Sequence, residues 1–364
     1  MSPIQVKKWV LKTLPEPGLP FDLSQDSEKS TFQLVKQELS SSDLKDGEFL
    51  SETLYLSNDP AQKFWIASID KNYSSGVQPG DVIPARGIAR VIASKNPQFS
   101  VGAFVTGLTG WATHCIANSE SQFRTIDATK VDELWWYLSV LGSTALTAYF
   151  IFYKYAGLQE REEDYGKTFL ISGAAGAVGT VSVQLALHVF KASRVIAIAG
   201  GPEKVKYLKS FSDKVTVVDY KKESFRDDLL KAAGGPNTVD FFIDNVGGEI
   251  LDLGTVLLKQ RGTILACGSI SGYNDPSKFV YKAYGAVITK RLTIKGLLVT
   301  DNISEFPTAW KKLAALVKEG YIDVTKSATI KKAEGDDFKL VPQIWNGLFS
   351  GINKGKLITQ VKEA

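Results

Sequence analysis

A glycine-rich segment between an apolar run and a helical pattern constrains the fold of this 364-residue chain more than any other feature. It reads Ser172-Gly173-Ala174-Ala175-Gly176-Ala177-Val178-Gly179, and it joins the run Thr168–Ser172 to a predicted helix through Val181–Phe190. Small residues let the backbone approach a pyrophosphate, while the helix N-terminus supplies N–H groups and partial positive charge. The context predicts a dinucleotide site at Gly176, Ala177, Val178 and Gly179, with a ligand-free turn as the alternative.

Apolar runs alternate with helical patterns on both sides of this turn. The predicted strands are Thr168–Ser172, Arg194–Ala199, Val215–Val218, Val239–Ile243, Gly262–Ala266 and Leu292–Leu298. The predicted helices are Val181–Phe190, Pro202–Ser210, Ser224–Ala233 and one within Asp301–Glu319. Strands and helices at this spacing predict an α/β domain with a doubly wound parallel sheet.

The two ends of the chain have a different pattern. Short β-runs broken by Gly, Pro, Asn and Asp occur before the alternating region, such as Asp81–Pro84, Ala89–Ala93 and Gly102–Thr106. The tail from Ile322 returns to short runs and ends in a predicted strand, Lys356–Val361. We therefore expect a mostly β domain made of residues 1–142 and 322–364, and a nucleotide-binding domain made of residues 143–321.

The end of the second predicted strand indicates which dinucleotide binds. An NAD site places an Asp or Glu there, about twenty residues after the glycine-rich turn, to bind the ribose 2′-hydroxyl. Here the strand ends in Gly200-Gly201-Pro202, and the cation Lys204 follows. A small residue and a nearby cation accept a 2′-phosphate that an acid would repel, so Gly200 and Lys204 predict NADPH. The alternative is that Lys204 is only a solvated helix residue.

Two more turns of small residues follow predicted strands. Asp244–Gly248 follows the fourth strand, and Cys267–Tyr273 follows the fifth. Ligands of open α/β sheets bind at the carboxyl ends of the strands. We therefore expect both turns to face the same ligand as the glycine-rich turn, although turns at strand ends can also be purely structural.

Composition excludes several classes of function. The net charge is only +4, and Lys and Arg are spread along the chain, so we expect no nucleic-acid partner. The only histidines are His114 and His188, and the only cysteines are Cys115 and Cys267. Since zinc sites need about three or four clustered ligands, we predict no metal. The two cysteines are expected to be free thiols in a reducing compartment.

One uncharged stretch raises the question of a membrane. Residues 134–153 meet the length rule for a membrane helix, but the polar residues Ser139, Ser143 and Thr147 interrupt the stretch. We favour a buried interdomain helix. No apolar segment follows Lys7 and Lys8, so we expect no signal peptide, no membrane partner and a cytoplasmic location.

Several motifs resemble those of one enzyme family. Besides the three turns, they are Ser57-Asn58-Asp59-Pro60, Gly87-Ile88-Ala89-Arg90-Val91, Gly107-Leu108-Thr109-Gly110-Trp111, Leu146-Thr147-Ala148-Tyr149 and Asn353-Lys354-Gly355-Lys356. Over most of its length the chain resembles the zinc-independent branch of the medium-chain dehydrogenase/reductase superfamily. Within that branch it is most similar to the prostaglandin reductase and plant double-bond reductase group.

The resemblance implies a Rossmann domain joined to a GroES-like catalytic domain, with NADPH as the cofactor. It implies that Lys204 and Tyr220 bind the 2′-phosphate. It also implies that the rest of the cofactor site is lined by Thr147, Asn245, Cys267, Gly268, Ser269, Ile270, Ser271, Tyr273, Leu297, Leu298, Val299 and Asn353. A homodimer is implied as well, because Rossmann domains in this family often pair through edge strands.

Two departures from the family bear on catalysis. This chain has Asp59-Pro60-Ala61-Gln62-Lys63 where relatives usually have Asp-Pro-Tyr-Met-Arg, and Thr289 replaces a tyrosine that many relatives carry near the nicotinamide. The candidates to replace that phenol are Tyr273, Tyr281 and Tyr284. A phenol is protonated at neutral pH and can donate to a developing enolate. The alternative is that these side chains only pack in a loop or an interface.

The resemblance implies reduction of the carbon–carbon double bond of an α,β-unsaturated aldehyde or ketone. Hydride from NADPH would reach the β-carbon, and positioned donors would stabilise the charge on the carbonyl oxygen. The expected partner is therefore a small α,β-unsaturated carbonyl compound. Two alternatives stay open: a quinone reductase on the same fold, and a non-catalytic sensor or scaffold that binds NADPH.

Overall fold

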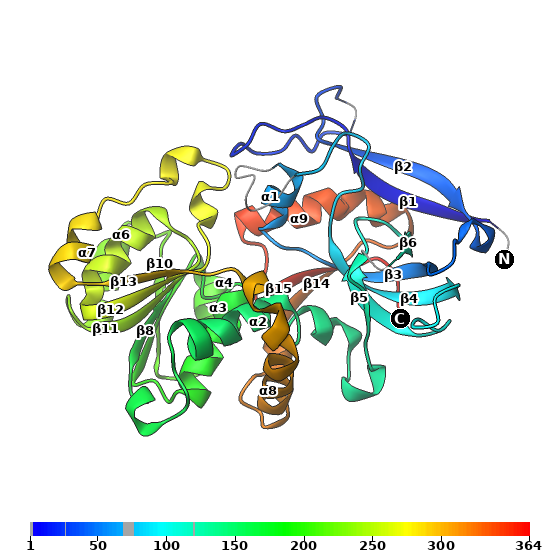
Figure 1. Ribbon diagram of the computed structural model, residues 1–364. Helices are drawn as coiled ribbons and strands as arrows, with labels where there is room; N and C mark the ends of the chain where they lie inside the picture. The colour runs from blue at the N-terminus through cyan, green and yellow to red at the C-terminus, as the bar shows by residue number, and fades with distance from the viewer. Residues whose placement is uncertain (1–2, 26, 68–75, 119–120) are drawn as a thin grey trace. The chain divides into compact units, whose positions relative to one another are not determined.

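The computed structural model describes residues 3–25, 27–67, 76–118 and 121–364. Its chain divides into two compact units: the strands of the first form a two-stranded and a seven-stranded sheet, and those of the second form a six-stranded sheet (Figure 1). The first unit contains residues 1–138, 329–352 and 357–364, and the second contains residues 139–328 and 353–356. The second unit holds the glycine-rich turn.

Six parallel strands form the sheet of the second unit. They are β8 (Thr168–Ile171), β9 (Arg194–Ala199), β10 (Val215–Asp219), β11 (Val239–Asp244), β12 (Leu258–Ala266) and β13 (Thr293–Gly296). Their spatial order is β10-β9-β8-β11-β12-β13, so the direction of the chain's progress across the sheet reverses between β8 and β11. The predicted α/β class and doubly wound sheet are therefore confirmed, and the reversal marks the place where such sheets bind ligands.

Helices connect these strands and cover the sheet. They are α2 (Ser143–Phe150), α3 (Ala177–Gln184), α4 (Pro202–Lys209), α5 (Phe225–Ala233), α6 (Gly248–Leu257), α7 (Tyr284–Lys290) and α8 (Phe306–Lys318). Helices α2 and α3 each continue into one π-helical turn, η5 (Ile151–Tyr155) and η7 (Leu185–Val189). Leu229 of α5 and Leu253 of α6 pack with Ile198 and Phe242 of the strands in one buried cluster. Each such buried side chain contributes about 1.5–3 kcal/mol, which holds the helices on the sheet.

The uncharged stretch 134–153 is two short helices rather than one long helix. The 3-10 helix η4 (Leu134–Leu138) ends before Ser139, and α2 begins only after its N-cap Gly142. The expectation of a single buried helix was therefore wrong, because the extended backbone of the N-cap Gly142 interrupts the helical path. No helix within the described parts of the chain has the length and apolarity to span a bilayer.

The first unit is mostly β. It contains β1 (Ile4–Leu11), β2 (Phe32–Leu39), β3 (Phe49–Ser57), β4 (Arg86–Ser94), β5 (Phe104–Leu108), β6 (His114–Ala117), β7 (Arg124–Thr125), β14 (Ala328–Lys332) and β15 (Lys356–Gln360), with helices α1 (Gln62–Ile66) and α9 (Val341–Ser350). Its core gathers Trp9, Trp111, Trp345, Phe32 and Phe338. The indole N–H of Trp9 donates to the Phe338 carbonyl at 3.1 Å, and that of Trp345 donates to the Asp59 carbonyl at 3.0 Å. The tail of the chain is thereby fixed to the N-terminal part.

Two sequence-based expectations for this unit were wrong. Asp81–Pro84 is not a strand: Val82 forms only an isolated bridge with Val10, and Pro84 has no N–H to extend the ladder. The tail contains helix α9 as well as the expected short runs. Helix α9 contains Pro342 and Gly347, two residue types that usually disfavour a helix. Pro342 is tolerated because it lies in the first turn, where the backbone N–H has no partner within the helix.

We predict opposite stability changes for two Gly→Ala substitutions in helices of the second unit. A Cβ at Gly254 of α6 would lie 2.3 Å from Cε1 of the buried Phe242, whereas a Cβ at Gly285 of α7 would meet nothing within 4 Å. Gly254→Ala should lower the free energy of unfolding by about 1–3 kcal/mol through overpacking. Gly285→Ala should raise it by about 0.5–1 kcal/mol, because alanine loses less backbone entropy. Urea unfolding checks both, and equal shifts would contradict the packing described for α6.

Candidate nucleotide-binding site

Ser172 and Asp244 join the turns that follow β8 and β11. The Ser172 hydroxyl donates to Asp244 Oδ1 at 2.7 Å, and the backbone N–H groups of Val246 and Gly247 donate to the same oxygen at 3.0 and 3.1 Å. Burial raises the pKa of the Asp244 carboxyl, and these hydrogen bonds oppose that rise. The three donors offset part of the cost of burying this carboxyl, and they hold the two strand ends together.

Asn245 closes the same junction from the other side. Its backbone N–H donates to Ser172 Oγ at 2.8 Å, and its side-chain amide donates to the Ser172 carbonyl at 2.7 Å. The Ser172 hydroxyl therefore both donates and accepts. The predicted cofactor residue Asn245 lies at the reversal point of the sheet, where its side chain orients the glycine-rich turn.

The third turn, Cys267–Tyr273, is bonded to the second. The Cys267 N–H donates to the Asp244 carbonyl at 2.8 Å, and the Ser271 N–H donates to the Val246 carbonyl at 3.1 Å. Gly247 has a φ of +72°, and a Cβ there would lie 2.2 Å from Ser269 Oγ. The structure thus brings together the three turns that the sequence singled out.

The glycine-rich turn has the geometry of a phosphate cradle. Gly173 has a φ of +58°, and a Cβ at Gly179 would lie 2.4 Å from the Gly173 carbonyl oxygen, so both positions need glycine. Within the described residues, no acceptor takes the N–H groups of Ala177, Val178 and Gly179 at the start of α3. Three unsatisfied N–H groups at a helix N-terminus fit a pyrophosphate.

A basic cluster surrounds the end of β9. A Cβ at Gly200 would lie 2.6 Å from Tyr220 Cε1 and 3.0 Å from Lys221 Cε, so these two side chains cover the glycine. Burial, and then the charge of Lys221, hold the pKa of the half-buried Lys204 below its ordinary value. The structure therefore brings the predicted residue Tyr220 onto Gly200, and the predicted residue Lys204 lies in the first turn of the helix that follows. Sequence reasoning missed Lys221, whose only signal was its position after the third strand.

The chain's tail reaches the glycine-rich turn. The Gly355 N–H donates to the Ala175 carbonyl at 2.8 Å, and the Asn353 side-chain amide donates to the Gly355 carbonyl at 2.6 Å. The predicted cofactor residue Asn353 therefore shapes the segment that lies against this turn. The carboxyl end of β13 is followed directly by three predicted cofactor residues, Leu297, Leu298 and Val299. Thr147 lies on α2, which packs against α3, and its hydroxyl donates to the Ser143 carbonyl at 2.9 Å.

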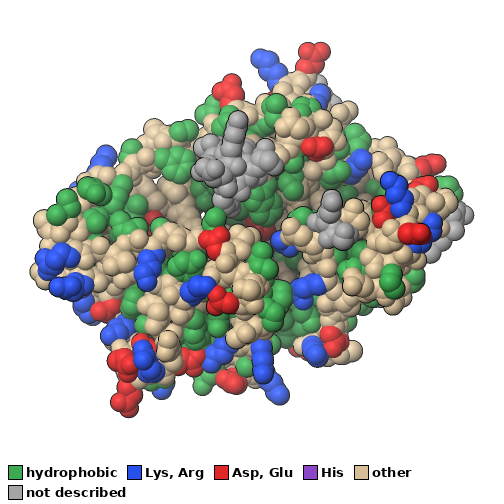
Figure 2. Space-filling view, in the orientation of Figure 1, with side chains coloured by type: hydrophobic (Ala, Val, Ile, Leu, Met, Phe, Trp, Pro, Cys, Tyr) green, Lys and Arg blue, Asp and Glu red, His purple; other side chains and the backbone are tan. Residues whose placement is uncertain are grey.

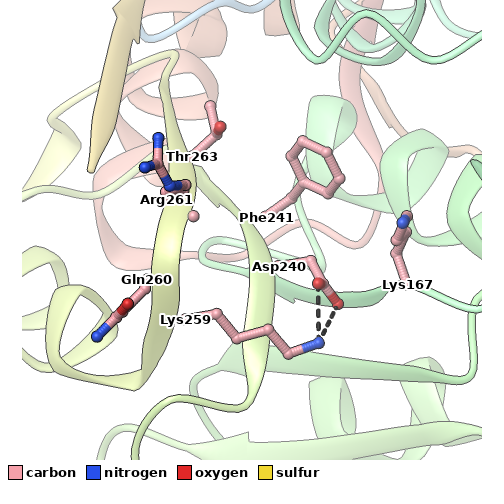
Figure 3. Close-up of a pocket in the computed structure, with 8 residues that line it drawn as sticks. Lys167, Asp240, Phe241, Lys259, Gln260, Arg261 and Thr263 are labelled. Atoms are coloured by element: carbon pink, nitrogen blue, oxygen red, sulfur yellow. Dashed lines mark hydrogen bonds and ion pairs between the residues drawn. The ribbon is translucent and has the colours of Figure 1, made fainter. Parts of the chain in front are cut away.

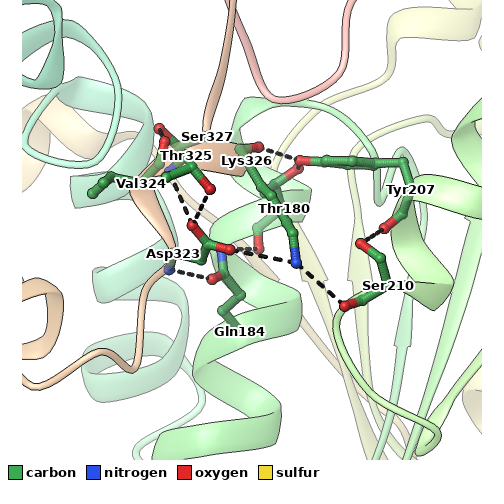
Figure 4. A network of polar contacts seen from close by, with 9 residues as sticks. All are labelled: Thr180, Gln184, Tyr207, Ser210, Asp323, Val324, Thr325, Lys326 and Ser327. Carbon is green, nitrogen blue, oxygen red and sulfur yellow. Dashed lines mark hydrogen bonds and ion pairs between the residues drawn. The ribbon is translucent and has the colours of Figure 1, made fainter.

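A polar network behind the site joins α3 and α4 (Figure 4). The Tyr207 hydroxyl of α4 donates to the Lys326 carbonyl at 2.5 Å and lies 3.1 Å from Thr180 Oγ1 of α3. Because the phenol has one proton, Thr180 is the donor in the second contact. Burial raises the pKa of Tyr207 to about 12, so this donor stays protonated. The network holds the helix of the glycine-rich turn beside the helix that carries Lys204.

The three candidate catalytic tyrosines lie in different surroundings. The Ser269 N–H donates to the Tyr273 hydroxyl oxygen at 3.4 Å, within the third turn. The Tyr281 hydroxyl lies 3.0 Å from Thr255 Oγ1, whose own proton goes to the Leu251 carbonyl, so Tyr281 donates to Thr255. Tyr284 on α7 is 61% exposed. Of the three, Tyr273 lies at the edge of the sheet where the turns meet.

A small cavity in this unit lies at the amino ends of the strands, opposite the ends that carry the three turns. Its volume is about 160 Å³, and residues at the amino ends of β8, β11 and β12 line it (Figure 3). The Lys259 ammonium contacts both oxygens of Asp240 at 2.8 and 2.9 Å. This cavity is far along the strands from the three turns, so we do not assign the nucleotide to it. Among the described residues, no three His, Cys, Asp or Glu side chains form a group that could hold a metal ion.

Comparisons with known proteins agree with this arrangement. Two family models match, one described as the N-terminal domain of oxidoreductase over residues 7–125 and one described as zinc-binding dehydrogenase over residues 177–315. The chain is 32% identical to prostaglandin reductase 1 of Bos taurus, over 98% of this chain and 99% of that protein. This chain belongs to the medium-chain dehydrogenase/reductase superfamily, in the group of the prostaglandin and alkenal reductases.

Two further relatives bear on what a member of this superfamily does. An uncharacterized membrane protein of Saccharomyces cerevisiae is 64% identical over 98% of this chain and 99% of its own length. The crystal structure of CurA from Vibrio vulnificus in complex with NADPH has a TM-score of 0.82 and 25% identity, over 98% of this chain and 100% of that one. The superfamily assignment makes the chain an oxidoreductase, and the relatives leave its substrate open.

Proposed function

We propose that this protein is an NADPH-dependent reductase of α,β-unsaturated aldehydes and ketones that adds hydride to the β-carbon. One observation carries the proposal. Three turns, a helix N-terminus and a basic cluster lie together at the carboxyl ends of the parallel strands. Relatives support the reaction class: besides prostaglandin reductase 1, the chain is 32% identical to the NADP(+)-dependent 2-alkenal reductase of Nicotiana tabacum, over 85% of this chain and 86% of that protein.

The residues at this edge divide the recognition of NADPH among them. The N–H groups of Ala177, Val178 and Gly179 would hold the pyrophosphate, because they have no acceptor in the described chain. Lys204 and Tyr220 would bind the 2′-phosphate beside Gly200, where an acid would repel it. The remaining turns, which carry Asn245 and Cys267–Tyr273, would line the rest of the cofactor.

Catalysis requires a donor for the charge that develops on the substrate carbonyl. When bound, NADPH supplies the hydride, and the substrate oxygen then gains negative charge as an enolate. We assign the protein donor to Tyr273, because the Ser269 N–H holds its oxygen within the turn that would face the cofactor. The hydroxyl of Thr289, at the position of the family tyrosine, points back to the Gly285 carbonyl of its own helix at 3.2 Å.

The proposed activity is tested by NADPH oxidation across a panel of 2-alkenals, enones and quinones. We expect turnover of enals and enones with NADPH, much weaker turnover with NADH, and no loss after treatment with a chelator. Turnover of quinones alone would identify a quinone reductase. Binding of NADPH without turnover of any compound would identify a sensor or scaffold, and either result would overturn the proposal.

We predict that Tyr273→Phe lowers kcat on a good enone by about 10²–10³-fold, the scale of one oxyanion donor, with little change in NADPH affinity. Tyr281→Phe is the matched control, because its hydroxyl already donates to Thr255 and should not be needed in the transition state. Steady-state kinetics and cofactor titration measure both variants. Wild-type kcat in Tyr273→Phe would leave the ribose hydroxyl and water as the donors.

We also propose that the protein forms a homodimer through β13. This edge strand is exposed along all four residues, and Ile288 of α7 beside it is 65% exposed. Figure 2 shows hydrophobic side chains next to Lys and Arg side chains at the left of the view, where Figure 1 labels α7. An exposed edge strand presents unpaired N–H and C=O groups, with which a strand of a second chain can pair.

Ile294→Lys in β13 should therefore convert the dimer to a monomer, because a lysine at the centre of a paired edge is desolvated or repelled. The control is Leu230→Lys on α5, which is 46% exposed and lies near β10 at the other edge of the sheet. Sedimentation at micromolar concentration distinguishes the two. A monomeric wild-type protein would contradict the assembly and leave the reductase proposal intact.

A further inference from the structure

A second lysine accompanies Lys204 at the end of β9. Lys221 follows β10, the neighbouring strand, and its side chain extends over Gly200 together with the ring of Tyr220. Lys204 lies in the first turn of α4, the helix that begins at Pro202 directly after this strand end. Two lysines from neighbouring parts of the sheet therefore lie near the end of β9, and the side chain of one of them packs over Gly200.

The position of Lys221 is built into the local backbone. Asp219 Oδ1 accepts the Gly201 N–H at 2.9 Å and the Lys221 N–H at 3.0 Å, so one buried carboxylate oxygen ties the two connections together. The Tyr220 N–H donates to the Ala199 carbonyl at 3.1 Å, which continues the strand pairing as far as the turn. Lys221 is thus fixed at its backbone, and only its side chain remains to meet a ligand.

The two lysines also lack acidic partners in the part of the chain that the structure describes. Among the described residues, no carboxylate lies within ion-pair distance of the Lys204 or Lys221 ammonium groups. The adjacent acid, Glu203, is paired with Lys354 at 3.8 Å. The charge of Lys221 also disfavours the protonated form of Lys204. Two like charges held close together are unfavourable by themselves, and a dianion between them removes the repulsion.

We propose that Lys221 is a specificity-determining residue that binds the 2′-phosphate of NADPH jointly with Lys204. The inference rests on the proposed use of NADPH and adds a residue to that site. A phosphate dianion held by two ammonium groups makes charge-assisted hydrogen bonds to both, whereas the 2′-hydroxyl of NADH has no charge for either lysine.

The test compares Lys221→Ala with Lys222→Ala, a neighbouring exposed lysine that we assign no role. Equilibrium binding of NADPH, NADH and 2′,5′-ADP is measured by calorimetry, so the readout does not depend on turnover. We expect Lys221→Ala to weaken NADPH and 2′,5′-ADP about tenfold, the scale of one hydrogen bond to a charged group, and to leave NADH unchanged. Lys221→Arg should retain most of the NADPH affinity, because it keeps the charge.

Two further measurements test the role of Lys221: the dependence of NADPH affinity on ionic strength, and the binding of both cofactors to the double variant. Lys221→Ala should flatten the fall of NADPH affinity with ionic strength, because one screened charge is gone. Lys204→Ala with Lys221→Ala should remove the preference for NADPH over NADH. The proposed role of Lys221 is wrong if Lys221→Ala binds NADPH as tightly as Lys222→Ala does. It is also wrong if Lys221→Ala lowers the affinities for NADH and NADPH by the same factor. If the wild-type protein itself shows no preference for NADPH, the proposed cofactor fails instead.

Discussion

The hydrogen bond from Ser172 to the buried Asp244 carboxylate is the contact on which the proposed site depends. It joins the two strands between which the order of the sheet reverses, and the same carboxylate holds the turn after β11 through two backbone N–H groups. The third turn then attaches to the Asp244 carbonyl through Cys267. A buried carboxylate is costly unless its donors are in place, so the three turns adopt their conformations together.

Groups that the protein leaves unpaired define what the site can recognise. Several polar groups of the three turns fix their shape, among them the side chains of Ser172, Asp244 and Ser271. The N–H groups at the start of α3 and the ammonium groups of Lys204 and Lys221 are different, since no described residue accepts from them. Unpaired donors and unpaired cations at one edge of a sheet are suited to phosphates, and Gly173 and Gly179 keep the space that a phosphate needs.

Contacts distant in sequence hold these groups in place. Tyr207 and Thr180 join helices α3 and α4 to the segment around Lys326, and Gly355 pairs with Ala175 of the glycine-rich turn. The helix that presents the N–H groups and the helix that presents Lys204 are thereby held side by side. Preorganised donors bind a ligand without the cost of ordering them first, which favours affinity and orientation alike.

The sequence alone determined the parallel sheet and the residues at its carboxyl edge, because strand–helix alternation and small-residue turns are local patterns. It also indicated Gly200 and Lys204, since the missing acid is visible at one strand end. Only the tertiary structure decided that Lys221 lies over Gly200 and that Tyr281 donates to Thr255. Those outcomes depend on which strands become neighbours and where side chains meet across them, and sequence periodicity carries no information about such contacts.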